Sequence, residues 1–445
     1  MPNPSPLPEP SIPPDPPASG HPGHLPAAPI PPSVPPTRLV YYSDQRLGSD
    51  HTSVESLFAK YLPRHLEVQV VYHDPENRPP GRVDAHRLVI PREQGRDDFL
   101  RQVSQVTPLT ARDIVVVRNI FSVLANLLDA RRRGGFRVGF HGSFPHSYRR
   151  LAETETLPFR ERRLPAWATL PTRIRKYCEY RYKRRIERTL IHRCDAFLPI
   201  SERLPPLMGI DPARVPIFPV PSGVDFALIP TPDATPEPTR ESGGRRLLYV
   251  GTVDPLRGPE VLFRALDGLS RRDWTLDIFT RDADFTREVI ANSMRHHRER
   301  VRLLPPLPRQ ELYQRMVSYD VGIGLIPPIP VYNVSSPIKI LEYFACGLPT
   351  LMTPLPECEL LFSRAGCGWF TPFTVEAVRE RLGEILETPL SECRRRGAIG
   401  RQIVAAHRNY ETMARFLATF LLSPLPPTEL SQTPAPHSPW MPGSP

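Results

Sequence analysis

Short apolar runs alternate with longer amphipathic stretches through two successive blocks of this chain. In the first block, runs typical of β-strands occupy residues 38–42, 66–72, 113–117, 136–140 and 195–200. Because these runs are almost continuously apolar, they indicate strands of a parallel sheet whose two faces are both covered by helices. Residues 37–229 are therefore predicted to form an N-terminal Rossmann-like domain.

A second block repeats the alternation after residues 230–244, which have the composition of a linker. Strands are predicted at 247–250, 276–279, 301–304, 321–325 and 348–352, and helices at 259–269, 284–294, 308–317, 337–346, 374–387 and within 391–421. Residues 245–404 are thus expected to form a C-terminal Rossmann-like domain. Ligands of such sheets bind outside the carboxyl ends of the strands. The predicted fold class is α/β, with two doubly wound parallel-sheet domains facing each other across a ligand cleft.

Proline is concentrated at the two ends of the chain. Residues 1–36 contain 16 of the 59 prolines, and residues 423–445 have a similar composition. Such segments bury too little apolar surface to offset their ordering entropy, so both are predicted to be disordered tails. A role as Pro-x-x-Pro ligands is the alternative interpretation.

The chain is basic, with a net charge of +10 and a pI near 9.5. This balance is compatible with nucleic acid, an anionic membrane or an anionic substrate as partner, or with a plain solvated surface. No nucleic-acid-binding module accompanies the charge, so no nucleic-acid partner is expected. The six cysteines form no Cys-x-x-Cys pair and lack zinc spacing with histidine, so no metal and no other cofactor is expected.

A basic stretch at residues 159–193 contains a predicted helix at 173–192 with tyrosines at 177, 180 and 182. It could lie against an anionic membrane, or it could be a solvated helix before the next strand. No signal-peptide pattern and no apolar run of the roughly 20 residues needed for a membrane span occurs. A cytoplasmic protein is expected, with any membrane contact peripheral, on the inner face of the cell membrane.

The segment from Ser335 to Pro349 carries the candidate chemistry. Ser336 is a suitable N-cap, Pro337 suits the first helical position, and Gly347 suits a left-handed C-terminal cap. The N-terminus of this short helix could hold a diphosphate, with hydroxyl donors from Ser335 and Ser336 and a positive charge from Lys339. Glu342, one turn on, could accept hydrogen bonds from ribose hydroxyls. The alternative is an ordinary capped helix whose Lys339 and Glu342 form a surface pair.

Five segments in order resemble the markers of glycosyltransferase family 4 (group 1), which has the two-domain GT-B fold. They are Cys194–Ser201, Pro219–Asp225, Val250–Gly258, Asp320–Pro327 and Ser336–Thr350. The resemblance implies a nucleotide-diphosphate-sugar donor on the C-terminal domain, an acceptor on the N-terminal domain, and a final helix, residues 405–422, that returns to the first domain.

The resemblance also implies residue roles. Gly251 would let the backbone approach the donor diphosphate, and Glu342 would hold the ribose. Arg257, where the family usually has lysine, would offset phosphate charge as the sugar departs, because guanidinium binds phosphate bidentately. His141 corresponds to a histidine near the transferred sugar in some members, although a satisfied loop histidine is an equal alternative. The expected catalytic residues are thus Arg257 and His141, and the expected donor-binding residues are Gly251, Thr252, Arg257, Ser335, Ser336, Lys339, Ile340 and Glu342.

Two positions depart from the family pattern. Thr252 stands where arginine is common, and Arg281 could supply the missing charge. Val334 stands where many members have a glutamate. The chemistry expected of the family is departure of a diphosphate, stabilised electrostatically, and needs no enzyme nucleophile.

The leading hypothesis is therefore a hexosyl-type glycosyltransferase. It would move a sugar to a glycan or lipid-linked acceptor with retention, in the synthesis of cell-surface polysaccharide or glycolipid. One alternative is a sugar-nucleotide epimerase of the same fold, although Val334 offers no acidic group beside the sugar. Another is a non-catalytic protein that binds partners through its proline-rich tails.

Overall fold

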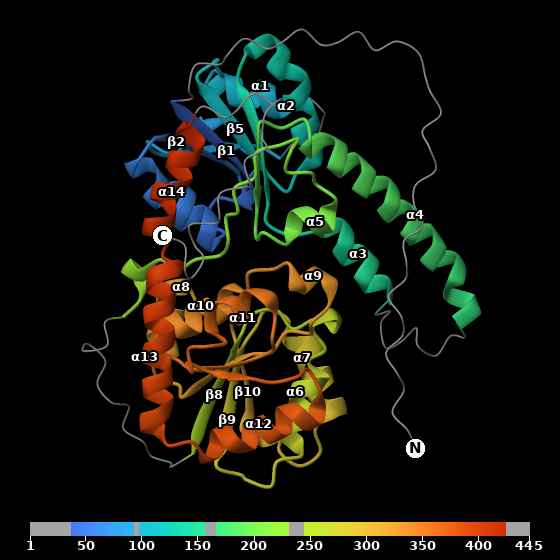
Figure 1. The fold of residues 1–445 in the computed structure, drawn as a ribbon, viewed down its shortest axis with the longest axis vertical. Coiled ribbons are helices and arrows are strands. Elements are labelled where there is room, and N and C mark those ends of the chain that lie inside the picture. Colours follow the sequence, from blue (N-terminus) through green and yellow to red (C-terminus); the bar gives the residue numbers. More distant parts are fainter. Residues whose placement is uncertain (1–36, 93–97, 156–165, 231–243, 424–445) are drawn as a thin grey trace. The chain divides into compact units, whose positions relative to one another are not determined.

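A computed structural model describes residues 37–92, 98–155, 166–230 and 244–423 (Figure 1). The predicted tails and the predicted linker lie outside the described residues, apart from Pro230, Gly244 and Ser423. Two separate sheets are present, one in each of the predicted blocks, and both are almost wholly parallel.

The first sheet has the strand order β3-β4-β2-β1-β5-β6-β7. All its pairings are parallel except that of β3 with β4. The strands are β1 (Arg38–Arg46), β2 (Glu67–His73), β3 (Gly81–Arg82), β4 (Arg87–Ile90), β5 (Asp113–Arg118), β6 (Arg137–Gly142) and β7 (Ala196–Pro199). The central strands are fully buried, as continuous apolar runs require.

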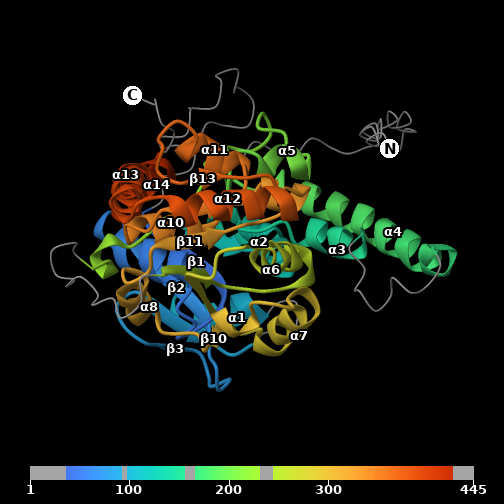
Figure 2. The same cartoon turned by 90° about the horizontal axis from the view of Figure 1, so that it is seen from below.

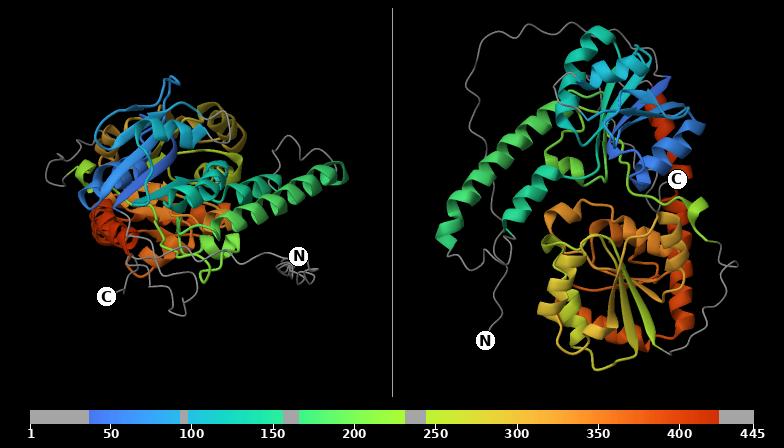
Figure 3. Two further views of the ribbon diagram at one scale, coloured as in Figure 1. Left: turned by 90° about the horizontal axis from the view of Figure 1, so that it is seen from above. Right: turned by 180° about the vertical axis from the view of Figure 1, so that it is seen from behind.

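Helical elements cover both faces of this sheet. Alternate side chains of β1 illustrate the division, since Val40 packs into one apolar cluster and Leu39 into the other. The first cluster includes side chains of α1 (Asp98–Val106) and α2 (Phe121–Gly134), and the second those of the helical segment η1 (Ser53–Tyr61). Two further helices, α3 (His146–Glu155) and α4 (Ala166–Ile191), run side by side (Figures 1 and 3).

The second sheet has six strands in the order β10-β9-β8-β11-β12-β13, all parallel. They are β8 (Arg245–Val250), β9 (Trp274–Phe279), β10 (Val301–Leu304), β11 (Val321–Gly324), β12 (Thr350–Met352) and β13 (Trp369–Phe370). The α-helices of this block are α6 (Glu260–Asp267), α7 (Ala283–Ser293), α8 (Arg309–Met316), α9 (Pro330–Asn333), α10 (Ile338–Ala345), α11 (Pro356–Phe362), α12 (Val375–Glu387) and α13 (Leu390–His407), as Figure 1 shows. Figure 2 shows the same fold from below.

Helix α13 packs against α10 through two glycines. A Cβ added at Gly397 would lie 1.8 Å from the Gly347 carbonyl oxygen, and one at Gly400 would lie 2.1 Å from Phe344. Glycine at both positions therefore lets α13 approach the end of α10 closely. This contact holds in place the helix that carries the candidate chemistry.

Helix α13 ends at His407, and a separate helix, α14 (Tyr410–Leu422), follows it. The side chain of Asn409 caps α14 by accepting a hydrogen bond from Glu411 N at 3.0 Å. The apolar face of α14 packs with the second cluster of the first sheet, through Tyr410, Met413, Ala414, Leu417, Ala418 and Leu421. α14, drawn in red in Figure 1, lies against η1.

The structure confirms the predicted strands and helices to within a few residues, with α4 beginning earlier than expected. The short strands β3, β4 and β13 were not predicted, because segments this brief have too little pattern to distinguish them from loops. No helix within the described residues is both long and apolar enough to cross a membrane.

Candidate functional site

The chain turns sharply where β8 ends. Gly251 has φ +115°, a conformation that side chains rarely adopt, and its N–H donates to Phe279 O at 3.0 Å. A Cβ at this position would meet no atom within 4 Å, so the backbone here faces open space. This is the geometry that a close backbone approach to a ligand requires.

Arg257 ends the short helical turn that follows. The Asp254 carboxylate caps this turn by accepting from Arg257 N at 3.0 Å, and Gly258 continues at φ +56°. The Arg257 guanidinium lies 5.3 Å from the centroid of the Tyr332 ring, and its Nε is buried without a hydrogen-bond partner. Arg257 thus offers an unsatisfied donor.

The donor helix begins one residue later than predicted. α10 starts at Ile338 with Pro337 as N-cap and no side-chain cap bond, so the prediction of Ser336 as N-cap is wrong. Ser336 Oγ instead accepts from Ser222 N at 3.1 Å and donates to Glu357 Oε1 at 3.3 Å. Ser335 Oγ donates to Tyr332 O at 2.7 Å. Both hydroxyl protons are therefore engaged inside the protein, and neither serine is a free donor in this structure.

The C-terminal end of α10 is as predicted. Gly347 has φ +74° and its N–H donates to Phe344 O at 2.8 Å. This left-handed residue ends the helix and leads through Pro349 into β12.

Lys339 is buried, and its amino group has no hydrogen-bond partner. The Nζ atom lies 4.0 Å from the centroid of the Tyr249 ring. Burial lowers the pKa of Lys339 well below its ordinary value, and the nearby Arg257 guanidinium lowers it further. The Asp254 carboxylate opposes this shift, but it forms no hydrogen bond with the Lys339 amino group. An anionic ligand would stabilise such a pair of neighbouring cationic groups.

Glu342 lies one turn along the same helix and is also buried. Its Oε1 accepts a hydrogen bond from the Tyr313 hydroxyl of α8 at 2.9 Å. Burial raises the pKa of this carboxyl group above its ordinary value. The alternative that Lys339 and Glu342 form an exposed surface pair is wrong, because both side chains are buried.

The remaining donor-side candidates have other environments. Ile340 is part of the apolar core beneath the helix, so only its backbone could face a ligand. Thr252 is exposed, and its carbonyl accepts from the Tyr249 hydroxyl at 2.8 Å. Arg281 is exposed and follows the end of β9.

No cluster of three metal-ligating carboxylate, imidazole or thiol groups occurs among the described residues. The chain does contain one Asp-x-Asp sequence, Asp282-Ala283-Asp284. Asp282 accepts from Val253 N at 3.1 Å, whereas Asp284 pairs with Arg287 at 2.7 Å. The two carboxylates therefore have separate structural partners.

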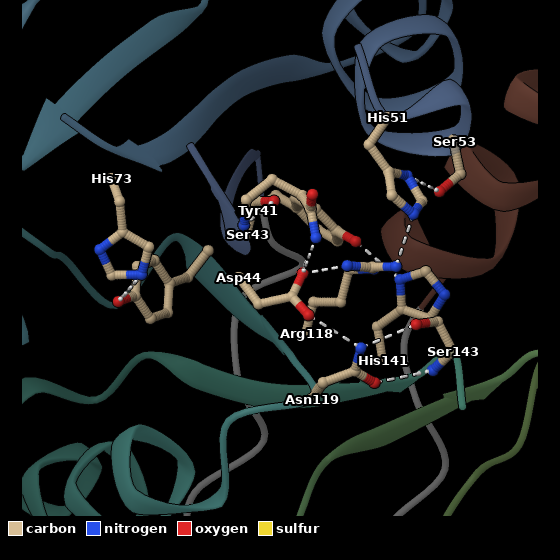
Figure 4. A network of polar contacts seen from close by, with 12 residues as sticks. Tyr41, Ser43, Asp44, His51, Ser53, His73, Arg118, Asn119, His141 and Ser143 are labelled. Carbon is tan, nitrogen blue, oxygen red and sulfur yellow. Dashed lines mark hydrogen bonds and ion pairs between the residues drawn. The ribbon is translucent and has the colours of Figure 1, made fainter. Parts of the chain in front are cut away.

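His141 lies at the end of β6 inside a buried polar network (Figure 4). Its Nδ1 and the Tyr41 hydroxyl are 2.7 Å apart, and its Nε2 is buried without a partner. Burial lowers the pKa of His141 well below its ordinary value, and the Arg118 charge adds to this effect, so the ring is neutral near pH 7. A neutral imidazole with one free nitrogen can accept or donate a single hydrogen bond.

The rest of the network follows the carboxyl ends of β1, β5 and β6. Arg118 pairs with Asp44 and contacts His51 Nε2 at 2.9 Å. Asn119 donates to Asp44 at 3.1 Å and to Ser143 at 2.8 Å. None of these residues except the His-Gly-Ser segment at 141–143 was singled out from the sequence. The available signal was the position of Asp44 and Asn119 at predicted strand ends.

Comparisons with known proteins identify the second block. Residues 244–388 match the family Glycosyl transferases group 1. A D-inositol 3-phosphate glycosyltransferase from Kineococcus radiotolerans is 30% identical over 186 residues, which is 36% of this chain and 40% of that protein. The chain therefore matches about two fifths of the length of this curated relative.

Solved structures match over most of the chain. A sucrose-phosphate synthase from Thermosynechococcus elongatus has a TM-score of 0.64 at 14% identity, covering 86% of this chain and 98% of that one. Anabaena HepE, solved with UDP and glucose, has a TM-score of 0.60 at 13% identity, covering 86% and 99%. At these identities the likeness establishes the fold. This chain thus has the GT-B fold, and its residues 244–388 match the group 1 glycosyl transferases.

Proposed function

We propose that this protein transfers a hexosyl group from a nucleotide-diphosphate sugar to a hydroxyl of a glycan or lipid-linked acceptor, with retention of configuration. The observation that carries the proposal is the buried Lys339 amino group beside Arg257, which has no hydrogen-bond partner. Burial of an uncompensated cation is costly, and a bound diphosphate would supply the missing charge.

Each donor-side residue has a task in this proposal. The diphosphate approaches the open backbone at Gly251 and is neutralised by Lys339 and Arg257. Their fixed charges stabilise the diphosphate as the bond to the sugar breaks, so no metal is required. Glu342 accepts hydrogen bonds from the ribose hydroxyls, oriented by the Tyr313 hydroxyl. HepE has been solved with UDP-glucose, which supports a nucleotide sugar as the donor.

Ser335 and Ser336 have a role other than the phosphate binding that the sequence predicts. Ser222 Oγ donates to Ser336 O at 2.8 Å and Ser222 N donates to Ser336 Oγ at 3.1 Å. The Glu357 carboxylate that accepts from Ser336 is itself held by Arg408 at 2.7 Å. We propose that these bonds position the start of α10, and that the serine hydroxyls contact phosphate only if they exchange these partners.

The acceptor side is proposed to lie on the first sheet, with His141 near the transferred sugar. The free Nε2 of His141 would bond a hydroxyl of that sugar. The proposed setting is synthesis of cell-surface polysaccharide or glycolipid by a cytoplasmic protein peripheral to the inner face of the membrane. Exposed Tyr177 and Tyr182 among the basic residues of α4 support a membrane contact in the region 159–193.

The test is incubation of the purified protein with labelled UDP-, GDP- and ADP-sugars, with and without an extract of lipid and glycan acceptors. We expect one donor to be hydrolysed slowly alone and consumed faster with acceptor. Glu342→Ala should weaken binding of that donor roughly 10- to 100-fold, because it loses charge-assisted hydrogen bonds. Glu380→Ala, at an exposed position of α12, is the matched control. Release of an epimerised sugar without acceptor, or an unaffected Glu342→Ala variant, contradicts the proposal.

A further inference from the structure

A cavity of about 780 Å³ opens at the carboxyl ends of β1, β2 and β4 in the first sheet. Its lining includes Tyr42, Asp44, Arg46, His73, Asp74 and Arg92. Small-molecule sites have volumes of roughly 300–1,000 Å³ and, in parallel sheets, occur at this end of the strands. Gly251, Arg257, Lys339 and Glu342 do not line this cavity.

The two carboxylates of the cavity are already neutralised. Asp74 accepts from the Arg78 side chain at 3.0 Å and from Glu76 N at 2.8 Å. Asp44 pairs with Arg118 and accepts from Asn119 at 3.1 Å. Neither acid is therefore available as a counter-ion for another cation.

The two remaining arginines have no such partner. The guanidinium groups of Arg46 and Arg92 form no ion pair or hydrogen bond with the residues that the structure describes. Arg92 is fixed through its backbone, whose N–H donates to Asn77 Oδ1 at 2.7 Å. Two exposed guanidinium groups of the cavity lining are therefore left without a carboxylate partner among the described residues.

His73, the last residue of β2, also lines the cavity. Its Nε2 is 3.1 Å from the Tyr42 hydroxyl, and its Nδ1 is buried without a partner. Burial lowers the pKa of His73, and the charges of Arg92 and Arg46 lower it further, so the ring stays neutral and offers one hydrogen bond. The cavity thus combines two free guanidiniums with an unsatisfied ring nitrogen.

We propose that the acceptor of this protein carries a phosphate or another compact anionic group, which Arg46 and Arg92 bind in this cavity. The inference rests on the proposed transfer function and narrows its acceptor to an anionic class. Guanidinium is suited to such groups because its planar N–H donors match two oxygens of one anion. Asp44 and the network behind it would keep the anion away from the sheet, leaving the neutral part of the acceptor to face the transferred sugar.

The test compares glucose 6-phosphate with glucose as binding probes at constant ionic strength, by thermal shift and calorimetry on the full-length protein. We expect the phosphate ester to bind, glucose to bind at least tenfold more weakly, and Arg46→Gln/Arg92→Gln to remove the preference. Arg132→Gln/Arg133→Gln is the charge-matched control, since both side chains are exposed on α2. Arg46→Lys/Arg92→Lys should restore part of the preference.

Both double variants keep Arg257 and Lys339, so any phosphate bound at the donor side contributes equally and cancels in the comparison. Vesicles containing phosphatidic acid, tested with the same variants, separate a lipid phosphate from a soluble one. Equal binding of glucose 6-phosphate by the glutamine variant and the control overturns the inference. Binding of a nucleoside diphosphate by all variants is measured in parallel, so that failure of the donor proposal is recognised separately.

Discussion

The Lys339 amino group lies 4.0 Å from the centroid of the Tyr249 ring, buried and without a hydrogen-bond partner. A cation held in this way destabilises the ligand-free protein, because the free-energy cost of its desolvation is only partly offset by its contact with the ring. The same charge is what an anionic donor needs. Removal of the Lys339 charge should therefore stabilise the empty protein and weaken its binding of the anionic donor.

Lys339→Met is expected to raise the free energy of unfolding of the empty protein by roughly 1–3 kcal/mol, because a buried charge gives way to a side chain of similar length without charge. Burial holds the folded-state pKa of Lys339 below the ordinary value of 10.5 that applies when the chain is unfolded. At pH values between the folded-state pKa and the unfolded-state pKa, the unfolded state therefore binds more protons than the folded state. Over this pH range the stability of the wild type rises with pH. The advantage of the variant should shrink as the pH rises toward 10.5. Urea unfolding from pH 6 to 10 measures this, and a variant less stable at every pH would contradict it.

Gly251→Ala tests the open backbone at the end of β8. At φ +115° an alanine costs about 1–2 kcal/mol of stability, and its methyl group would occupy the space proposed for the diphosphate. Gly347→Ala is a suitable control, because Gly347 also has positive φ and an open surround but ends α10. We expect comparable losses of stability, with nucleotide binding weakened only by Gly251→Ala. Calorimetric titration would refute the role of Gly251 if both variants bound nucleotide like the wild type.

Gly400→Ala tests the contact that positions α10. The added Cβ would lie 2.1 Å from Phe344, a buried residue of α10, and such overpacking costs roughly 1–3 kcal/mol. Gly383→Ala in α12 adds a Cβ with nothing within 4 Å and should instead stabilise by up to about 1 kcal/mol through helix propensity. Thermal unfolding of the two variants should thus shift in opposite directions. Equal shifts would contradict the close approach of α13 to α10.

Exposed basic residues of α4 are proposed to contact an anionic membrane. Arg175→Gln/Arg181→Gln/Arg185→Gln should lower affinity for vesicles rich in phosphatidylserine at least tenfold, since each charge near such a surface contributes about 1 kcal/mol. A control that removes three exposed arginines elsewhere is Arg132→Gln/Arg133→Gln/Arg364→Gln. Sedimentation with vesicles measures the affinity. An equal loss of affinity in both variants would contradict the proposed contact, because it would mean that only the net charge matters.

The fold could be predicted from the local pattern of apolar and polar residues, whereas the site could be predicted from it only in part. Pro337, Gly347 and Pro349 mark the limits of α10 in the sequence, and the structure confirms the helix there. The prediction of Ser336 as N-cap is wrong because the Ser336 hydroxyl bonds instead to Ser222 and Glu357, which are distant along the chain. Local helix rules cannot see such partners.

The environment of the site residues was equally beyond the sequence. Tyr249 and Tyr313 reach Lys339 and Glu342 only because β8 and α8 pack against α10. Likewise, the unpaired state of Arg46 and Arg92 depends on Arg78 and Arg118 having already engaged the two acids of the cavity. The residue types were visible in the sequence, but which charges remain uncompensated is decided by tertiary contacts.

The central claim is that Arg257 and Lys339 together bind the donor diphosphate. Its most direct test is calorimetric titration of the best-bound nucleoside diphosphate into the wild type, Arg257→Gln/Lys339→Met and the exposed-site control Arg132→Gln/Arg133→Gln. Loss of two charge-assisted contacts predicts affinity at least 100-fold weaker for the first variant and unchanged affinity for the control. A dissociation constant equal to that of the wild type in the first variant would contradict the claim.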